Sequence, residues 1–413
     1  MTRFEVIRDP LWNNIRLEPE ALAVVDTPAV QRLRYVRQLG HAFLVYPGAT
    51  HTRFEHSLGA YHLARRVLAQ LDELEGRRPD PAEGLAVRIA ALLHDIGHYP
   101  FSHALEEAGL PRHEDLAARH LTTGPLAGTL ERIGVPAARL LPLIRGTSPS
   151  PLAGIVAGAL DVDKLDYLSR DATMCGVPYG VIDVDRLLTS LTLTDGRLAL
   201  HPKGLAALES LLFAKYQMYR NVYWHHAVRS ATAMFKRLVR RTIAAGRMTA
   251  ETVAIETDDG LIHELQQHDP TGLAGALRER RLAKRALDIP GTDLPRETAD
   301  WPSTDPDLLQ RVEERLAREL GLGEDQLFLD FPSKPHMLDV TIPVVGRRGD
   351  AAQHLGLPRV AAELHRSAQR LRVFVLRPVE IRPQAIIGLV TWPREEVAAR
   401  LAGDRALLSA AAR

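Results

Sequence analysis

The feature that most restricts how this chain can fold is a strongly apolar run that ends in a histidine and an aspartate. Residues 89–93 (IAALL) predict a buried helix, and His94 and Asp95 follow them directly. Burying an imidazole beside a carboxylate costs free energy unless both groups have partners. Because a divalent metal can satisfy both groups at once, this stretch predicts a core helix that delivers metal ligands at its end.

Two helix breakers, Gly97 and Pro100, follow this pair in the sequence. We therefore expect His98 and His103 to project from a turn beside the metal ligands. Imidazoles and carboxylates are the usual groups for proton transfer near neutral pH. One short segment thus supplies candidate metal ligands and candidate proton donors together.

Length and composition indicate an ordinary globular protein. A chain of 413 residues is longer than one core usually grows, so we expect one large domain and a smaller one. The formal net charge of +1 gives no overall preference for nucleic acid or anionic membrane. A single cysteine, Cys175, excludes an internal disulfide and favours a cytoplasmic setting. We find no signal-peptide pattern and no apolar run that could span a bilayer.

The periodicity of apolar residues predicts a mainly α protein. We expect the helical domain to cover residues 1–300 and a small α+β lobe to cover 301–413, with a linker between Pro302 and Pro306. Helices are predicted over 53–71, 113–145, 204–246, 310–320 and 358–370, a loop over 76–84, and a basic, loosely helical stretch over 270–298. Extended segments are predicted over 5–20, 327–331, 338–342 and 371–375, with a hairpin over 181–203 that turns at Asp195-Gly196.

Two histidines and two aspartates on predicted helices, or at their ends, form a candidate metal set: His56, His94, Asp95 and Asp163. Two imidazoles and two carboxylates make a mixed nitrogen and oxygen site. Such a site suits Mn, Fe, Zn or Mg better than a soft metal.

Four blocks carry a resemblance to a known family. They are residues 26–40 (DTPAVQRLRYVRQLG), 53–59 (RFEHSLG), 94–103 (HDIGHYPFSH) and 161–171 (DVDKLDYLSRD). Together they resemble the HD-domain deoxynucleoside triphosphate triphosphohydrolases over roughly residues 5–245. The resemblance implies an HD-type helical core and hydrolysis of dNTPs to deoxynucleoside and intact triphosphate. It also implies that the candidate metal set holds a divalent metal.

The resemblance further implies roles for residues around the reacting phosphate. His98, His103 with Glu106, and His113 with Glu114 match the catalytic groups, and Arg53 and Lys164, with His98, match the phosphate-holding groups. A carboxylate beside an imidazole raises its pKa, which suits a histidine that donates a proton to a leaving oxygen. The ordinary alternatives are a helix cap for His98 and His103, and surface ion pairs for the others.

The sugar end of the substrate is matched by a second group of residues. Gln38 and Asp171 match the readers of the 3′-hydroxyl, Tyr167 and Tyr223 the aromatics around the deoxyribose, and Leu39 the contact to the base. Core packing is the alternative for the two tyrosines. The chain departs from the family at Lys215, where an arginine often holds the γ-phosphate, and at Trp224, where a glutamine is usual.

A regulatory site is also implied. Asp26, Gln31 and Arg34 match a trio that reads a guanine nucleotide at an activating site between subunits, so we expect at least a dimer, and rather a tetramer or hexamer. Upstream, Glu5 and Arg8 depart from the family pattern, and Glu5 would repel a triphosphate.

Two alternative functions stay open at this point. An HD phosphohydrolase can act on a nucleoside monophosphate or a cyclic dinucleotide, although the Gly-Tyr-Pro motif of the latter branch is replaced here by Val177-Pro178-Tyr179. A non-catalytic module that binds nucleotides or single-stranded nucleic acid could use the basic run 278–285.

Overall fold

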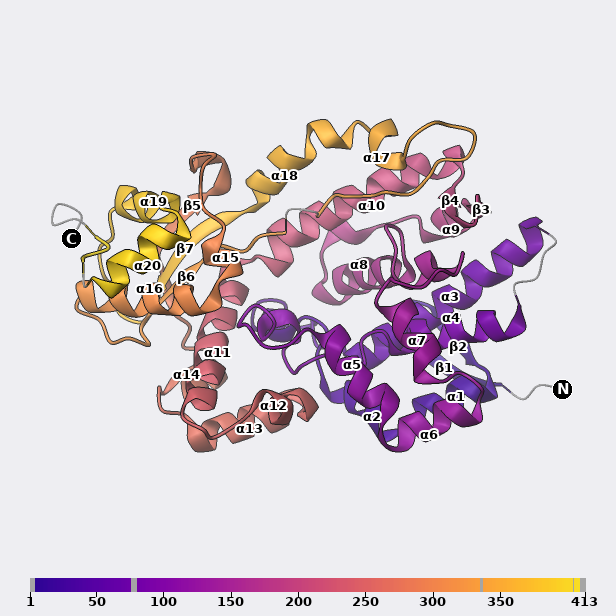
Figure 1. Cartoon of the computed structure of the whole chain (residues 1–413), viewed down its shortest axis with the longest axis horizontal. Coiled ribbons are helices and arrows are strands. Elements are labelled where there is room, and N and C mark those ends of the chain that lie inside the picture. Colours follow the sequence, from indigo (N-terminus) through magenta and orange to yellow (C-terminus); the bar gives the residue numbers. More distant parts are fainter. Residues whose placement is uncertain (1–3, 76–79, 335–336, 404, 409–413) are drawn as a thin grey trace.

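The computed structural model describes residues 4–75, 80–334, 337–403 and 405–408, and it is mainly α as predicted. The molecule is elongated, with the N-terminal helical domain at one end and the C-terminal lobe at the other (Figure 1). No helix among these residues is long and apolar enough to cross a membrane.

Three helices form the centre of the N-terminal domain: α3 (Arg53–Glu75), α4 (Pro81–Leu93) and α8 (Val162–Cys175). The apolar run at the end of α4 is buried, as predicted. Asp80 caps α4 by accepting a hydrogen bond from Ala82 N–H, so the helix begins inside the predicted loop 76–84, of which residues 76–79 lie outside the described ranges.

Smaller elements surround this centre. The extended start is an antiparallel hairpin of β1 (Glu5–Asp9) and β2 (Asn13–Leu17), as predicted. The helices of this layer are α1 (Pro19–Val25), α2 (Pro28–Arg32), α5 (His113–Thr122), α6 (Gly124–Arg132), α7 (Ala137–Ile144) and α9 (Val184–Leu188). The second predicted hairpin is β3 (Leu191–Thr194) with β4 (Arg197–Leu200), and Asp195 and Gly196 both have positive φ in the turn.

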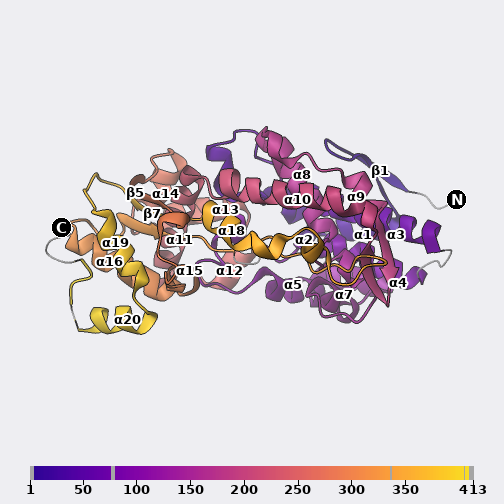
Figure 2. The ribbon, with the colours of Figure 1, turned by 90° about the horizontal axis from the view of Figure 1, so that it is seen from above.

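The long helix predicted over 204–246 is interrupted. It consists of α10 (Leu205–Met218), one turn of π-helix (Tyr219–Tyr223) and α11 (His226–Ala244). Figure 2 shows α10 with α18 (Ala361–Ala368) beside it, which joins the lobe to the helical domain. The periodicity of apolar residues cannot detect a single wide turn, yet such turns often occur where a helix supplies functional side chains.

The C-terminal lobe is built on a three-stranded antiparallel sheet in the order β5-β7-β6. The strands are β5 (Lys284–Pro290), β6 (Leu327–Asp330) and β7 (Arg370–Val375). The lobe and its junction with the domain also contain α12 (Ala250–Ile255), α13 (Asp258–His268), α14 (Leu273–Arg278), α15 (Trp301–Thr304), α16 (Pro306–Glu319), α17 (Ala351–His354), α19 (Pro383–Thr391) and α20 (Arg394–Ala402).

Three predictions for this half of the chain were wrong. The basic stretch 270–298 is α-helical only in α14 and has a short 3-10 helix at Gly291–Asp293, because Leu287 and Ile289 alternate into the core as strand β5. The predicted linker is occupied by α15 and the start of α16, since Trp301 is fully buried. Residues 338–342 form no strand, although Leu338, Val340 and Ile342 are buried in the core. The domain boundary at 300 stays a prediction.

Candidate active site

The four predicted metal ligands lie together where α3, α4 and α8 meet. The Nε2 atoms of His56 and His94 are 3.1 Å apart, and Asp163 Oδ1 lies 3.1 Å from the first and 3.6 Å from the second. Asp95 brings one oxygen to 3.6 Å from His56 Nε2 and the other to 3.4 Å from His94 Nε2. Two nitrogens and two carboxylates thus converge on one point.

Hydrogen bonds on the far side of each ring fix its orientation. His56 Nδ1 lies 2.8 Å from Asp166 Oδ2, and His94 Nδ1 lies 2.8 Å from Ala91 O. A proton on Nδ1 in both rings leaves the Nε2 lone pairs facing each other, which is the arrangement that a metal ion requires. The donor set therefore fits a divalent metal.

Electrostatics agree with this assignment. Burial alone would lower the pKa of His56, but hydrogen bonds to Asp163 and Asp166 raise it to about 10. Burial would raise the pKa of Asp95, but Arg53 and the neighbouring histidines hold it well below its ordinary value. The centre is therefore an anionic site that stabilises positive charge.

A buried network that the sequence did not predict supports His56. Arg170 donates to both oxygens of Asp166 over 2.9 Å, and Trp12 Nε1–H donates to Asp166 Oδ1 over 2.5 Å. Asp9 accepts from Arg170 over 2.9 Å, so the N-terminal hairpin is tied to the metal centre. Asp166 and Arg170 lie in the block 161–171 that carries the family resemblance, but no role was predicted for either.

Close backbone approach brings α3 and α8 together beside this network. A Cβ on Gly59 would lie 1.8 Å from Asp166 Oδ1 and 2.6 Å from Arg170 Nη2. Only glycine leaves room for the ion pair against α3 at this position.

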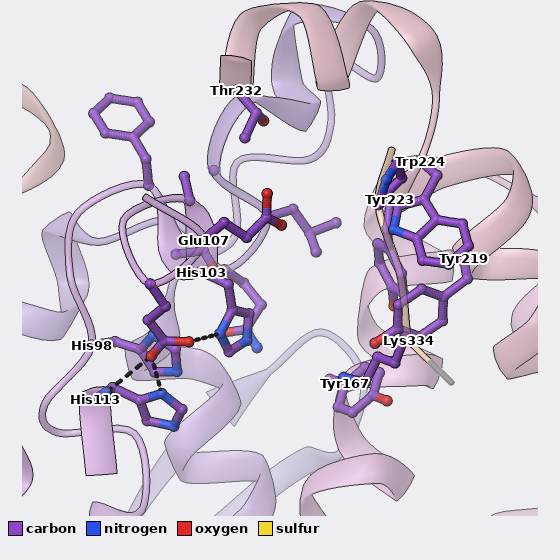
Figure 3. Close-up of a pocket in the computed structure, with 18 of the residues that line it drawn as sticks. His98, His103, Glu107, His113, Tyr167, Tyr219, Tyr223, Trp224, Thr232 and Lys334 are labelled. Carbon is purple, nitrogen blue, oxygen red and sulfur yellow. Dashed lines mark hydrogen bonds and ion pairs between the residues drawn. The ribbon is translucent and has the colours of Figure 1, made fainter. Parts of the chain in front are cut away.

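A second cluster surrounds His98, and Figure 3 shows His98, His103 and His113 of it. Its members are the other predicted catalytic residues: His103, Glu106, His113 and Glu114. Glu106 accepts from His103 Nδ1 over 2.9 Å and from His113 Nδ1 over 2.5 Å. The His98 ring stacks on the His113 ring at 3.7 Å between centres. Glu114 lies farther from His113, at 3.5 Å, and accepts instead from Arg112 over 2.8 Å. Glu106 rather than Glu114 is thus the hydrogen-bonded partner of His113.

A strained turn joins the two clusters. Phe101 and Ser102 both have positive φ, at 58° and 65°. Asp258 of α13 accepts from Phe101 N–H over 2.9 Å, and Arg53 donates to Ser102 Oγ over 2.5 Å. Backbone strain of this kind persists only where the surroundings enforce it, and it is concentrated at functional sites. Arg53 also donates to Asp95, so it connects the turn to the metal centre.

The predicted sugar-side residues line the same cavity of about 780 Å³. Asp171 pairs one oxygen with His51 Nε2 over 2.8 Å and accepts from the Tyr223 hydroxyl over 2.7 Å with the other. Gln38 is buried, and its Oε1 has no hydrogen-bond partner among the described residues. Leu39 and Tyr167 complete this part of the wall. His51 was not predicted, although it lies two residues before the block at 53–59.

Lysines occupy the wall opposite the histidine cluster. Lys164 donates to Asp161 Oδ2 over 2.5 Å and to Gly158 O over 2.9 Å. Lys215 is 4% exposed, and burial followed by repulsion from Lys164 and Lys334 lowers its pKa to about 7. Lys334, which no motif indicated, reaches this wall from the C-terminal lobe (Figure 3).

The predicted regulatory trio lies outside the cavity. Arg34 Nε donates to Gln31 Oε1 over 2.8 Å, and its guanidinium stacks on Phe54 at 3.6 Å from the ring centre. Asp26 ends α1 and is exposed, and Thr27 rather than Asp26 is the N-cap of α2. The basic run 278–285 is largely engaged: Arg278, Arg280, Arg281 and Arg285 each donate to groups of this chain.

Comparison with protein families agrees with this geometry. The HD domain matches residues 53–171, and the HD associated region matches residues 182–377. HD domains bind divalent metals, which confirms the predicted class of cofactor.

Individual proteins are also similar to this chain in sequence. An uncharacterized protein of Methanocaldococcus jannaschii is 32% identical over 351 residues, which cover 84% of this chain and 73% of that protein. The uncharacterized protein YwfO of Bacillus subtilis is 32% identical over 57% of this chain and 55% of its own length. The deoxynucleoside triphosphate triphosphohydrolase SAMHD1 of Homo sapiens is 29% identical over 54% of this chain. The match covers 42% of SAMHD1, so this chain spans less than half of that relative.

Solved structures with a similar fold include a hypothetical protein from Aquifex aeolicus, with a TM-score of 0.72 and 28% identity over 90% of this chain and 96% of that one. A phosphohydrolase from Bacteroides thetaiotaomicron gives a TM-score of 0.70 at 24% identity, over 91% of this chain and 100% of that one, and supports the fold alone.

Proposed function

Because the chain belongs to the HD-domain phosphohydrolase family, we propose that it hydrolyses deoxynucleoside triphosphates to deoxynucleoside and inorganic triphosphate. One observation carries the proposal: three of the four metal ligands (His94, Asp95 and Asp163), the histidine cluster and the predicted sugar-reading residues line a single cavity. The similarity to a protein named as a dNTP triphosphohydrolase supports the substrate class.

His56, His94, Asp95 and Asp163 would hold a divalent metal, which would supply Lewis acidity to a phosphate oxygen and lower the pKa of water. Side chains of the protein bind the phosphates and transfer the proton. Arg53 and Lys164 both line the cavity and can donate to phosphate oxygens, and Arg suits a bidentate contact.

Proton transfer is assigned to His103. Burial alone would raise the pKa of Glu106, but the hydrogen bonds from His103 and His113 hold it well below its ordinary value, so Glu106 stays a carboxylate. A carboxylate that accepts from Nδ1 fixes the orientation and the tautomer of the imidazole. The other nitrogen, Nε2, is then the atom that gives its proton to the leaving 5′-oxygen.

Gln38 and Asp171 hold the sugar, with Tyr167 and Tyr223 around the ring. Gln38 Oε1 is buried without a partner, so it is free to accept from a 3′-hydroxyl. Leu39 lies beside it as the contact to the base.

The test is direct. The purified protein is incubated with Mn²⁺ and each dNTP, and the products are separated by ion-exchange chromatography. Deoxynucleoside and inorganic triphosphate are expected in equal amounts, whereas release of monophosphate or orthophosphate alone would contradict the proposal. An Asp163→Asn protein, which lacks one metal ligand, serves as the inactive control.

We further propose that a guanine nucleotide bound at Asp26, Gln31 and Arg34 activates a homo-oligomer of the enzyme. Gln31 and Arg34 already contact each other, and Arg34 stacks on Phe54, one residue after Arg53. Turnover of dTTP is expected to rise when GTP or dGTP is added, and Arg34→Ala is expected to abolish the rise. Equal dTTP turnover with and without GTP would remove the regulatory role.

A further inference from the structure

Two lysines in the cavity wall have no carboxylate partner. Among the described residues, no carboxylate lies within ion-pair distance of Lys215 or Lys334, although the neighbouring Lys164 is paired with Asp161. Lys215 is buried on α10, whereas Lys334 is exposed on the segment that follows β6. Like charges gathered at a cavity wall repel each other unless an anion joins them. This wall is therefore built for a strongly anionic ligand.

The lobe holds Lys334 in place. Lys334 N–H donates to His365 Nε2 over 3.1 Å, and Gln369 donates to Pro332 O over 3.1 Å, so the backbone is fixed at two points. Its ammonium lies 5.3 Å from the centre of the Tyr219 ring. Tyr219 in turn meets the Tyr223 ring edge-on at 5.0 Å. Tyr219 of the π-helix thus helps to hold the lysine at the cavity wall.

Figure 3 shows how the two walls face each other, with Lys334, Tyr219 and Tyr167 on one side and His103 and His113 on the other. A phosphate chain that begins at the metal centre would extend along the wall that carries the lysines. The terminal phosphate of a triphosphate carries the most negative charge, and Lys binds phosphate as a point charge.

We propose that Lys334 is a substrate-binding residue that the C-terminal lobe contributes to the site, where it contacts the outer phosphates of a triphosphate. This assignment rests on the proposed function and makes it more specific. With Lys164 and Lys215 it forms a three-lysine wall that selects nucleoside triphosphates over monophosphates. Without the lobe, the phosphate-binding part of the site is incomplete.

The experiment compares Lys334→Gln with wild type in two assays. In the first, inorganic triphosphate is titrated into the metal-loaded protein by calorimetry, with orthophosphate in parallel. In the second, KM and kcat are measured with the dNTP that the wild type turns over best. We expect Lys334→Gln to weaken triphosphate binding and to raise KM by about ten-fold or more, with kcat, metal content and thermal midpoint unchanged. Lys334→Arg is expected to retain at least part of the affinity.

Lys236→Gln is the matched control. Lys236 lines the same cavity, but its ammonium is paired with Glu107 at 3.1 Å, so its loss is expected to leave triphosphate affinity unchanged. Unchanged triphosphate affinity and KM in Lys334→Gln would overturn the assignment, as would an equal loss in Lys236→Gln. If the wild type turns over no dNTP, the proposed function fails, while the calorimetric comparison still decides whether Lys334 binds a phosphate chain.

Discussion

Replacing Lys215 by methionine should stabilise the protein while it impairs substrate binding. Lys215 is 4% exposed on α10, and burial, followed by repulsion from Lys164 and Lys334, lowers its pKa from 10.5 to about 7. Methionine has a similar length and no charge, so it removes the cost of keeping an ammonium in this position.

The magnitude follows from linkage. Between pH 7 and 10.5 the unfolded chain binds the proton more tightly than the folded protein, so native stability rises with pH across this window. At about 1.4 kcal/mol per pH unit, a pKa of about 7 in place of 10.5 costs the folded protein on the order of 4 kcal/mol at pH 7. We therefore expect Lys215→Met to raise the free energy of unfolding by up to about 4 kcal/mol at pH 7 and by little above pH 10.

The assay is urea unfolding of wild type and variant at pH 7 and pH 10, at constant metal concentration and without nucleotide. Lys203→Met, at an exposed lysine close in sequence, is the control and should change stability at neither pH. The reasoning is refuted if Lys215→Met is less stable than wild type at pH 7, or if its advantage is the same at both pH values.

Three further predictions concern the metal centre and the acid. Gly59→Ala should lower metal content and destabilise the protein by about 2 kcal/mol, because its Cβ would overlap Asp166 Oδ1; metal analysis and urea unfolding measure this, and Gly275→Ala, where a Cβ meets nothing within 4 Å, is the control. Trp12→Phe removes one hydrogen bond to Asp166 and should weaken metal affinity about ten-fold in a competition with a chelator; unchanged affinity would make the contact incidental. His103→Ala should lower kcat by roughly 10²–10⁴-fold with metal content retained, and loss of metal would show that it is a ligand.

Residues that are close together in the sequence were the ones that could be predicted. His94 and Asp95 are adjacent after an apolar helix, and His56 and Asp163 were added as candidate ligands because each lies in a block that carries the family resemblance. Glu106 was identified as the partner of His103 for the same reason, since three residues separate them.

Residues that act through tertiary contacts could not be predicted in this way. Trp12 and Asp166 are 154 positions apart, and nothing near Trp12 in the sequence indicates an acceptor. Lys334 lies in a lobe without motifs, and it reaches the cavity only because β6 and α18 direct its segment there. The strand at Lys284–Pro290 was missed because its charged residues obscured the alternation of Leu287 and Ile289, which pairing with β7 reveals.

That pairing makes the C-terminal lobe inseparable from the catalytic half. Strand β5 precedes the predicted boundary at residue 300, and its partner β7 comes from residues 370–375. A truncation at 300 would remove β7, the strand with which β5 pairs, and leave β5 unpaired with its apolar side chains uncovered, and unpaired strands invite aggregation. A catalytic half cut at residue 300 is therefore not a unit that can be exchanged between relatives without the lobe.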